Sequence, residues 1–205
     1  MALSEKLRKY LMSATAQELL QQDDVTKFLL NSFTLTESGT YKELIEFLMS
    51  KYDDIFGEIN TLTAGMFRDI IGVGNVSLNG TVDTIPSQCF ENAQLGTIEG
   101  NNVTIISAKA FYNCNSLRSI DFPKLEIIGS GAFTGCAQLS KVDLPKTIKR
   151  VGMRAFKDCP NLKQIHYHGT MEEVKKVLWG TAWDGSFDCS NIKIVCTDGE
   201  LCGNE

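Results

Sequence analysis

The chain has 205 residues, of which 43% are hydrophobic, so it is long enough for one large or two small domains with a sizeable core. Its formal net charge of −5 argues against binding to nucleic acid or anionic membranes through a basic surface. No apolar run approaches the roughly 20 residues that a membrane-spanning helix needs. The N-terminal segment lacks the apolar stretch and cleavage site of a secretory signal. We therefore expect no membrane insertion and no export by that route.

Residues 1–74 carry apolar side chains at helical spacing, which predicts four or five short helices packed as an all-α bundle. Capping boxes at Thr15-x-x-Glu18 and Thr40-x-x-Glu43 mark two helix starts. A further short helix is expected from Thr63, carrying Met66, Phe67, Ile70 and Ile71. Two interpretations stay open: a cap on the domain that follows, or a separate attachment or partner-binding domain. Four helices exceed what a cap requires, which favours the second.

Residues 75–168 repeat a pattern whose units can be aligned on phenylalanines 21, 22 and 23 residues apart: Phe90, Phe111, Phe133 and Phe156. In the last three units a cysteine follows the phenylalanine by three positions and a leucine follows it by six: Cys114, Cys136, Cys159, Leu117, Leu139 and Leu162. Each leucine precedes a stretch with strand-like alternation. One unit alone cannot bury these side chains, so the units are expected to stack around a common core.

The run from Ile128 to Pro145 reads Ile-Gly-x-x-Ala-Phe-x-x-Cys-x-x-Leu-x-x-Val-x-Leu-Pro. It resembles the leucine-rich repeats of the BspA type, found in bacterial and some protist surface proteins and in many phage or prophage proteins. The resemblance covers roughly residues 82–168. It implies a solenoid used for recognition or adhesion, without catalytic residues. The first unit departs from the pattern, with Ala93 in place of the cysteine, as a terminal repeat would.

The C-terminal segment predicts a closing unit. Thr170-x-x-Glu173 is a capping box for an amphipathic helix that ends at Gly180. A last strand is expected over residues 191–196, and the polar tail after it is expected to fray. The predicted fold is therefore α+β. It comprises a helical domain at 1–74, repeats forming four to five coils at 75–168, and a helical capping unit with a tail at 169–205.

The seven cysteines do not require disulfides. The three in the repeat column are expected to be free structural thiols, and the same is expected of Cys89, which precedes Phe90. Cys196 and Cys202 are close enough in sequence to close a loop. The odd total favours a reducing compartment.

Outward side chains on the repeat strands predict the working surface. One ladder is Glu99, Asp121, Asp143 and His166, and the ladder two positions earlier is Thr97, Ser119, Lys141 and Gln164. Arg118 and Lys163 lie at the edge. Stacked carboxylates would attract a cation or a basic partner group; alternatively, the lysines and arginine balance them on a merely solvated face. The predicted partner-binding residues are Glu99, Arg118, Ser119, Asp121, Lys141, Asp143, Lys163, Gln164 and His166.

Reactive chemistry has little support. His166 and His168, with Asp143, have the alternation of a metal site, but no Cys/His cluster accompanies them. Nucleophile-elbow and phosphate-loop motifs are absent from the sequence. The prediction is no catalytic residue, no metal and no cofactor.

Two functions follow from this sequence. The first is a non-enzymatic recognition module that binds a protein or cell-surface partner through the sheet face, such as a phage or bacterial adhesion component. The alternative is an intracellular adaptor, or a phage-encoded inhibitor that blocks a host protein. The expected location is the host cytoplasm or a virion.

Overall fold

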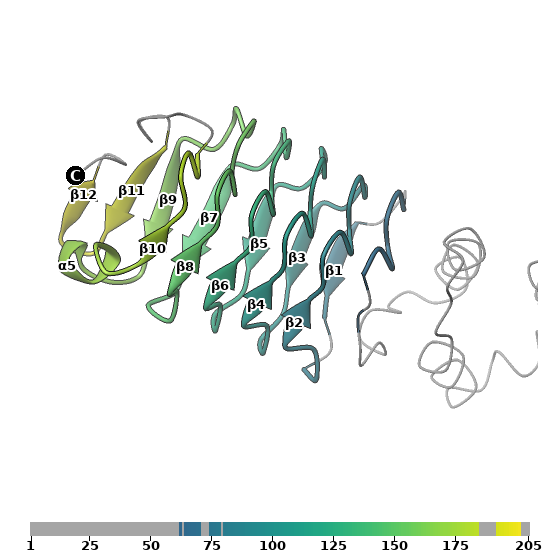
Figure 1. The fold of residues 1–205 in the computed structure, drawn as a ribbon, viewed down its shortest axis with the longest axis horizontal. Helices are drawn as coiled ribbons and strands as arrows, with labels where there is room; N and C mark the ends of the chain where they lie inside the picture. Colours follow the sequence, from purple (N-terminus) through teal and green to yellow (C-terminus); the bar gives the residue numbers. More distant parts are fainter. Residues whose placement is uncertain (1–61, 63, 71–73, 79, 185–191, 202–205) are drawn as a thin grey trace, which may run out of the picture.

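The computed structural model describes residues 62, 64–70, 74–78, 80–184 and 192–201. In this part of the chain, successive coils lie side by side and form a solenoid with two sheets (Figure 1). The solenoid confirms the central part of the predicted fold. The expected all-α bundle falls mainly on residues 1–61, which lie outside the described residues, so the structure does not support it.

The first sheet has seven strands. In spatial order they are β1 (Asn75–Ser77), β3 (Thr97–Glu99), β5 (Ser119–Asp121), β7 (Lys141–Leu144), β9 (Gln164–Tyr167), β11 (Lys193–Cys196) and β12 (Gly199–Leu201). Neighbours pair in parallel except β11 and β12, which are antiparallel. Buried and outward residues alternate along the repeat strands: the central Ile98 and Ile120 are buried in β3 and β5, and the second and fourth residues are buried in β7 and β9.

The second sheet has five very short strands. In spatial order they are β10 (Leu178–Trp179), β8 (Arg150–Val151), β6 (Ile127–Ile128), β4 (Ile105–Ile106) and β2 (Thr84–Ile85). All pair in parallel, and each of the five coils that begin at β1, β3, β5, β7 and β9 contributes one strand to each sheet. In the strands of the repeat region the second residue is fully buried, and it is always isoleucine or valine, which pack well on a pleated surface.

A column of phenylalanine rings fills the turn side of the core. Phe90, Phe111, Phe133 and Phe156 are buried, and consecutive ring centroids lie 5.1–5.3 Å apart with interplanar angles of 2–6°. Beside this column each repeat cysteine donates its thiol hydrogen bond to the phenylalanine carbonyl of the preceding coil. The three repeat leucines are also buried. Identical side chains therefore fill identical positions from coil to coil, as a stacked repeat requires.

Glycine is required where adjacent coils approach most closely. A Cβ atom on Gly152 would lie 2.5 Å from the Ser130 amide nitrogen and 2.6 Å from the Gly129 carbonyl carbon. A Cβ on Gly129 would meet the backbone at Ser107 and Ala108 at 2.5 Å. These contacts are too short for any real side chain, so the Ile/Val-Gly pairs fix the spacing between coils.

The short helix expected from Thr63 is not present in the described residues, because residues 64–69 are turns. Phe67 instead extends the phenylalanine column, with its ring 5.1 Å from that of Phe90. Its amide donates a hydrogen bond to the Cys89 carbonyl, as in later coils. The helical spacing of Met66, Phe67 and Ile70 was misleading, since all three face the solenoid core.

The predicted helical cap is also wrong in its extent. The capping box of Thr170 and Glu173 is present, but the helix α5 spans only Met171–Val174. The chain then enters β10, where the Leu178 amide donates to the Lys149 carbonyl and the Gly180 amide to the Val151 carbonyl. Pairing with the existing sheet thus replaces further helical turns.

The strand predicted at 191–196 is present as β11. The tail does not fray at once, because β12 pairs with β11 and Leu201 is buried. Residues 202–205 lie outside the described residues.

Candidate recognition surface

The two predicted ladders lie on the outer face of the first sheet. Strand register places Thr97 beside Ser119 and Ser119 beside Lys141, and it pairs Glu99 with Asp121. Equivalent positions on adjacent strands are separated by about 4.8 Å. Asp143 and His166 are likewise direct neighbours in register on β7 and β9. The surface is consequently a regular array whose members come from consecutive coils.

Charge is unevenly distributed along this array. Glu99 and Asp121 are exposed, and neither forms an ion pair with any residue in the described ranges. Asp143 is half-buried, and one of its carboxylate oxygens lies 3.0 Å from the Lys141 ammonium. The expected column of three uncompensated carboxylates is therefore reduced to two, on β3 and β5.

The two histidines contact different partners. The Nε2 atom of His166 lies 3.0 Å from the Gln164 side-chain nitrogen, within its own strand. His168 places Nε2 3.7 Å from the other carboxylate oxygen of Asp143. Within the described residues, no group of three His, Cys, Asp or Glu side chains is arranged to hold a metal ion. The metal interpretation of His166, His168 and Asp143 gains no support from this arrangement.

Arg118 and Lys163 immediately precede β5 and β9, at one end of these strands, and both are exposed. The Arg118 amide donates to the Gly96 carbonyl, and the Lys193 amide donates to the Lys163 carbonyl. Their backbones are therefore fixed by the neighbouring coils while their side chains remain accessible.

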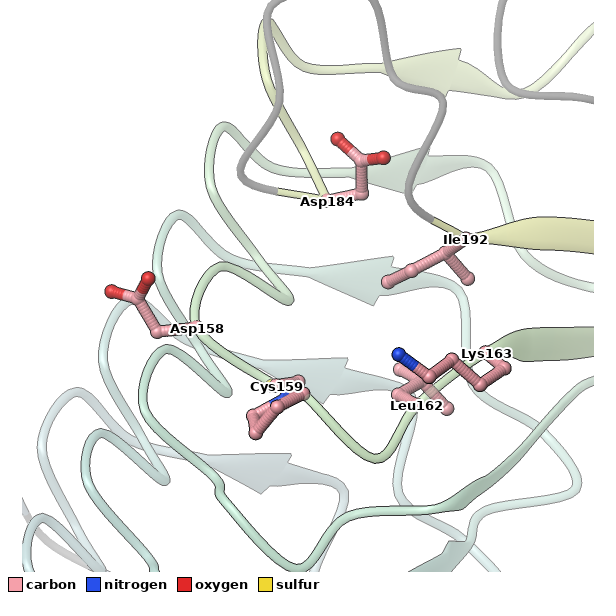
Figure 2. A pocket seen from close by; sticks show the side chains of 7 residues that line it. Asp158, Cys159, Leu162, Lys163, Asp184 and Ile192 are labelled. Carbon is pink, nitrogen blue, oxygen red and sulfur yellow. The ribbon is translucent and has the colours of Figure 1, made fainter.

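A hollow of about 300 Å³ lies beside Lys163, between the last phenylalanine turn and the closing unit. Its lining residues are Asp158, Cys159, Pro160, Leu162, Lys163, Asp184 and Ile192. The Lys163 side chain folds back over Leu162, whereas the carboxylates of Asp158 and Asp184 point away from the hollow (Figure 2). These polar groups do not converge on one point, so they do not form a reactive constellation.

The repeat thiols are structural. Burial raises the pKa of the Cys89, Cys136 and Cys159 thiols well above the ordinary value of 9.0, because the thiolate would lose its solvation. Cys114, in the same column as Cys136, donates to the Phe90 carbonyl at 2.9 Å. Protonated, hydrogen-bonded thiols are poor nucleophiles. Cys196 is also a free, buried cysteine.

Sequence reasoning missed the outer ladder of the second sheet. Its strands have only two residues each, too few to show alternation. The sequence does hold one signal for this ladder. The residue before each buried Ile or Val must face away from the core, because successive side chains of a strand point to opposite faces.

Comparison with protein-family models adds one match. The model for the BspA-type leucine-rich repeat region matches residues 27–117 and 60–179, in six copies. The matched residues span well over half of the chain. A comparison with curated proteins found no match. Among the described residues, no helix has the length and apolar character needed to cross a membrane.

Proposed function

This chain belongs to the BspA-type leucine-rich repeat family, and from this premise we propose that it binds a protein partner through the outer face of its first sheet. The family is a non-enzymatic repeat domain of a kind that typically mediates protein interactions or recognition. We extend this to the chain itself and infer that its role is binding, not catalysis. A stacked-coil surface offers many equivalent contact positions on a rigid support.

The observation that carries the proposal is the pair of exposed carboxylates on β3 and β5, Glu99 and Asp121, which form no ion pair with any described residue. Neighbouring like charges cost free energy that a basic partner group would relieve. The polar ladder of Thr97 and Ser119 beside them supplies hydrogen-bonding groups at the same spacing. A partner with lysines or arginines on a flat or gently curved surface fits this chemistry.

Two biological settings are compatible with such a surface. We propose a phage or bacterial adhesion component that recognises a receptor, with an adaptor or host-protein inhibitor in the cytoplasm as the alternative. Fractionation separates them: co-purification with virions supports the first, and a stoichiometric complex with a host protein in the cytoplasm supports the second.

Charge reversal tests the surface itself. Asp121→Lys should reduce capture of the partner from extracts of the native host by about tenfold or more, because it places a cation against the partner's basic groups. Glu172→Lys makes the same charge change on α5 and is the matched control. Quantitative mass spectrometry of the captured proteins is the readout. Equal capture by both variants, with unchanged melting temperatures, would place the contact surface elsewhere.

A further inference from the structure

The outer ladder of the second sheet is chemically unlike that of the first. It is formed by the first residue of each short strand: Thr84, Ile105, Ile127, Arg150 and Leu178. Three of its five members are aliphatic and none is acidic. We call this set the second-sheet ladder.

The apolar part of the second-sheet ladder is accessible to a partner. Leu178 is 70% exposed and Met153 is 48% exposed, and they are the exposed large hydrophobic residues of the described chain. They lie on neighbouring coils, since a Cβ atom on Gly180 would contact the Met153 amide nitrogen. β10 forms the end of the sheet next to β8 (Figure 1), and beyond Arg150 on β8 the half-buried Ile127 and Ile105 add two further aliphatic positions. Exposed apolar side chains that gather on one face and are bordered by polar residues are typical of interaction sites.

Cations flank the apolar positions. Arg150 lies in register between Ile127 and Leu178. Lys176 is exposed and precedes Leu178 by two residues, with the buried Val177 between them. Lys149 is neutralised by Glu126 at 2.7 Å, but neither Arg150 nor Lys176 forms an ion pair with any described residue.

We propose that the second-sheet ladder docks an acidic segment of a partner protein that carries aliphatic side chains. Ladder positions follow each other at about 4.8 Å, so aliphatic groups of the partner would cover Ile105, Ile127 and Leu178 while its carboxylates meet Arg150 and Lys176. Charge complementarity selects this occupant. The net charge of −5 disfavours non-specific attraction of anions to the chain as a whole. The attraction for the partner's carboxylates must therefore come from the local cations Arg150 and Lys176. This site is independent of the first-sheet surface.

The two tryptophans of the chain provide a built-in reporter. Trp179 follows Leu178 directly, and its ring centroid lies 4.6 Å from that of Trp183. The probe is a fluorescein-labelled peptide of alternating leucine and glutamate, with a leucine–lysine peptide of the same length as the charge control. Binding is measured on the full chain by fluorescence anisotropy and by the shift in tryptophan emission.

The wild-type chain should bind the leucine–glutamate peptide and shift its tryptophan emission. Leu178→Ser and the double variant Arg150→Glu/Lys176→Glu should each weaken binding about tenfold or more. Lys193→Glu reverses an exposed cation on β11, in the other sheet, and is the matched control; it should bind within about twofold of wild type. All three variants change exposed side chains, so circular dichroism should show native spectra.

Several results would overturn the proposal. They are no binding by the wild-type chain at millimolar peptide, equal binding of the leucine–lysine peptide, or unchanged affinity in Leu178→Ser and the double reversal. Preferential binding to phosphatidylserine-containing vesicles over the peptide would instead assign the ladder to a membrane surface.

Discussion

The middle coils, residues 80–168, and the described part of the closing unit, residues 169–184 and 192–201, extend the same two sheets with different side chains. In the middle, the Phe133 ring lies nearly parallel to those of Phe111 and Phe156, at 3° and 2°. In the closing unit Trp183 accepts the backbone hydrogen bond of Phe156 but turns its ring to 89°, with centroids 6.3 Å apart. The first sheet correspondingly ends on the antiparallel strand β12.

This difference shows how a repeat is continued and how it is ended. Face-to-face stacking leaves an equivalent surface for the next coil, so it propagates. A ring turned on edge does not offer the next coil the same surface. The reversed direction of β12 has the same effect on the first sheet. β11 pairs with β9 in parallel, but β12 runs antiparallel, so a further coil could not pair with it in the same register.

The largest expected effect comes from breaking the ring column in the middle. Phe133→Ala should lower the free energy of unfolding by about 3–5 kcal/mol, because it opens a cavity between two stacked rings. Met153→Ala truncates an exposed side chain and should cost far less. Chemical denaturation monitored by circular dichroism measures both. Similar midpoints for the two variants would contradict the buried column.

Close approach between coils gives the next largest effect. Gly152→Ala should cost about 1–3 kcal/mol, because its Cβ would overlap the backbone of the preceding coil. Gly74→Ala is the matched control, since a Cβ there meets nothing within 4 Å. The difference between their melting temperatures tests whether coil spacing is fixed at the Ile/Val-Gly pairs; no difference would refute it.

Alkaline pH probes the thiol column. The raised pKa of the Cys136 thiol means that ionisation favours the unfolded chain once pH exceeds 9.0, so stability present below that pH is lost as pH rises. Every thiol whose pKa is raised in the folded chain adds to this loss. Denaturant titrations between pH 8 and 10 should therefore show a shallower loss in Cys136→Ala than in wild type. Parallel curves would indicate that the thiol is accessible to water.

The closing unit gives the smallest effect. Thr170→Ala should destabilise the protein by about 1 kcal/mol, because it removes the side chain that caps α5.

The hydrogen bond from the Thr170 amide, aided by Lys146, holds the pKa of Glu173 below its ordinary value of 4.5. The stabilisation that the ionised Glu173 carboxylate gives to the fold is present above pH 4.5 and is lost as pH falls through the lower folded-state pKa. The stability difference between wild type and Glu173→Gln should therefore shrink in acid; a constant difference would count against the cap.

The repeat region could be predicted because its core residues recur in phase. Every repeat phenylalanine and leucine occupies an equivalent buried position, so one physical explanation applies to each coil. Phe67 escaped this reasoning because it follows Met66 instead of a small residue and has Ile70 where the repeats place cysteine. Its stacking on Phe90 and its amide hydrogen bond to the Cys89 carbonyl reveal the relationship.

The ends could not be predicted for a different reason. The capping box located the start of α5 correctly, but local spacing cannot report competition from a preformed sheet edge, which ends the helix after one turn. At the candidate site, sequence periodicity placed the outward residues in ladders. It could not show that Lys141 neutralises Asp143 while Glu99 and Asp121 have no ion-pair partner in the described chain, since that depends on side-chain distances.

The most direct test of the proposed recognition surface is carboxylate footprinting of the wild-type chain, free and bound to its captured partner. Glu99 and Asp121 should become protected from carbodiimide labelling on binding, while Glu172 on α5 keeps its reactivity. Protection of Glu172 with no change at Glu99 and Asp121 would contradict the assignment of recognition to the first sheet.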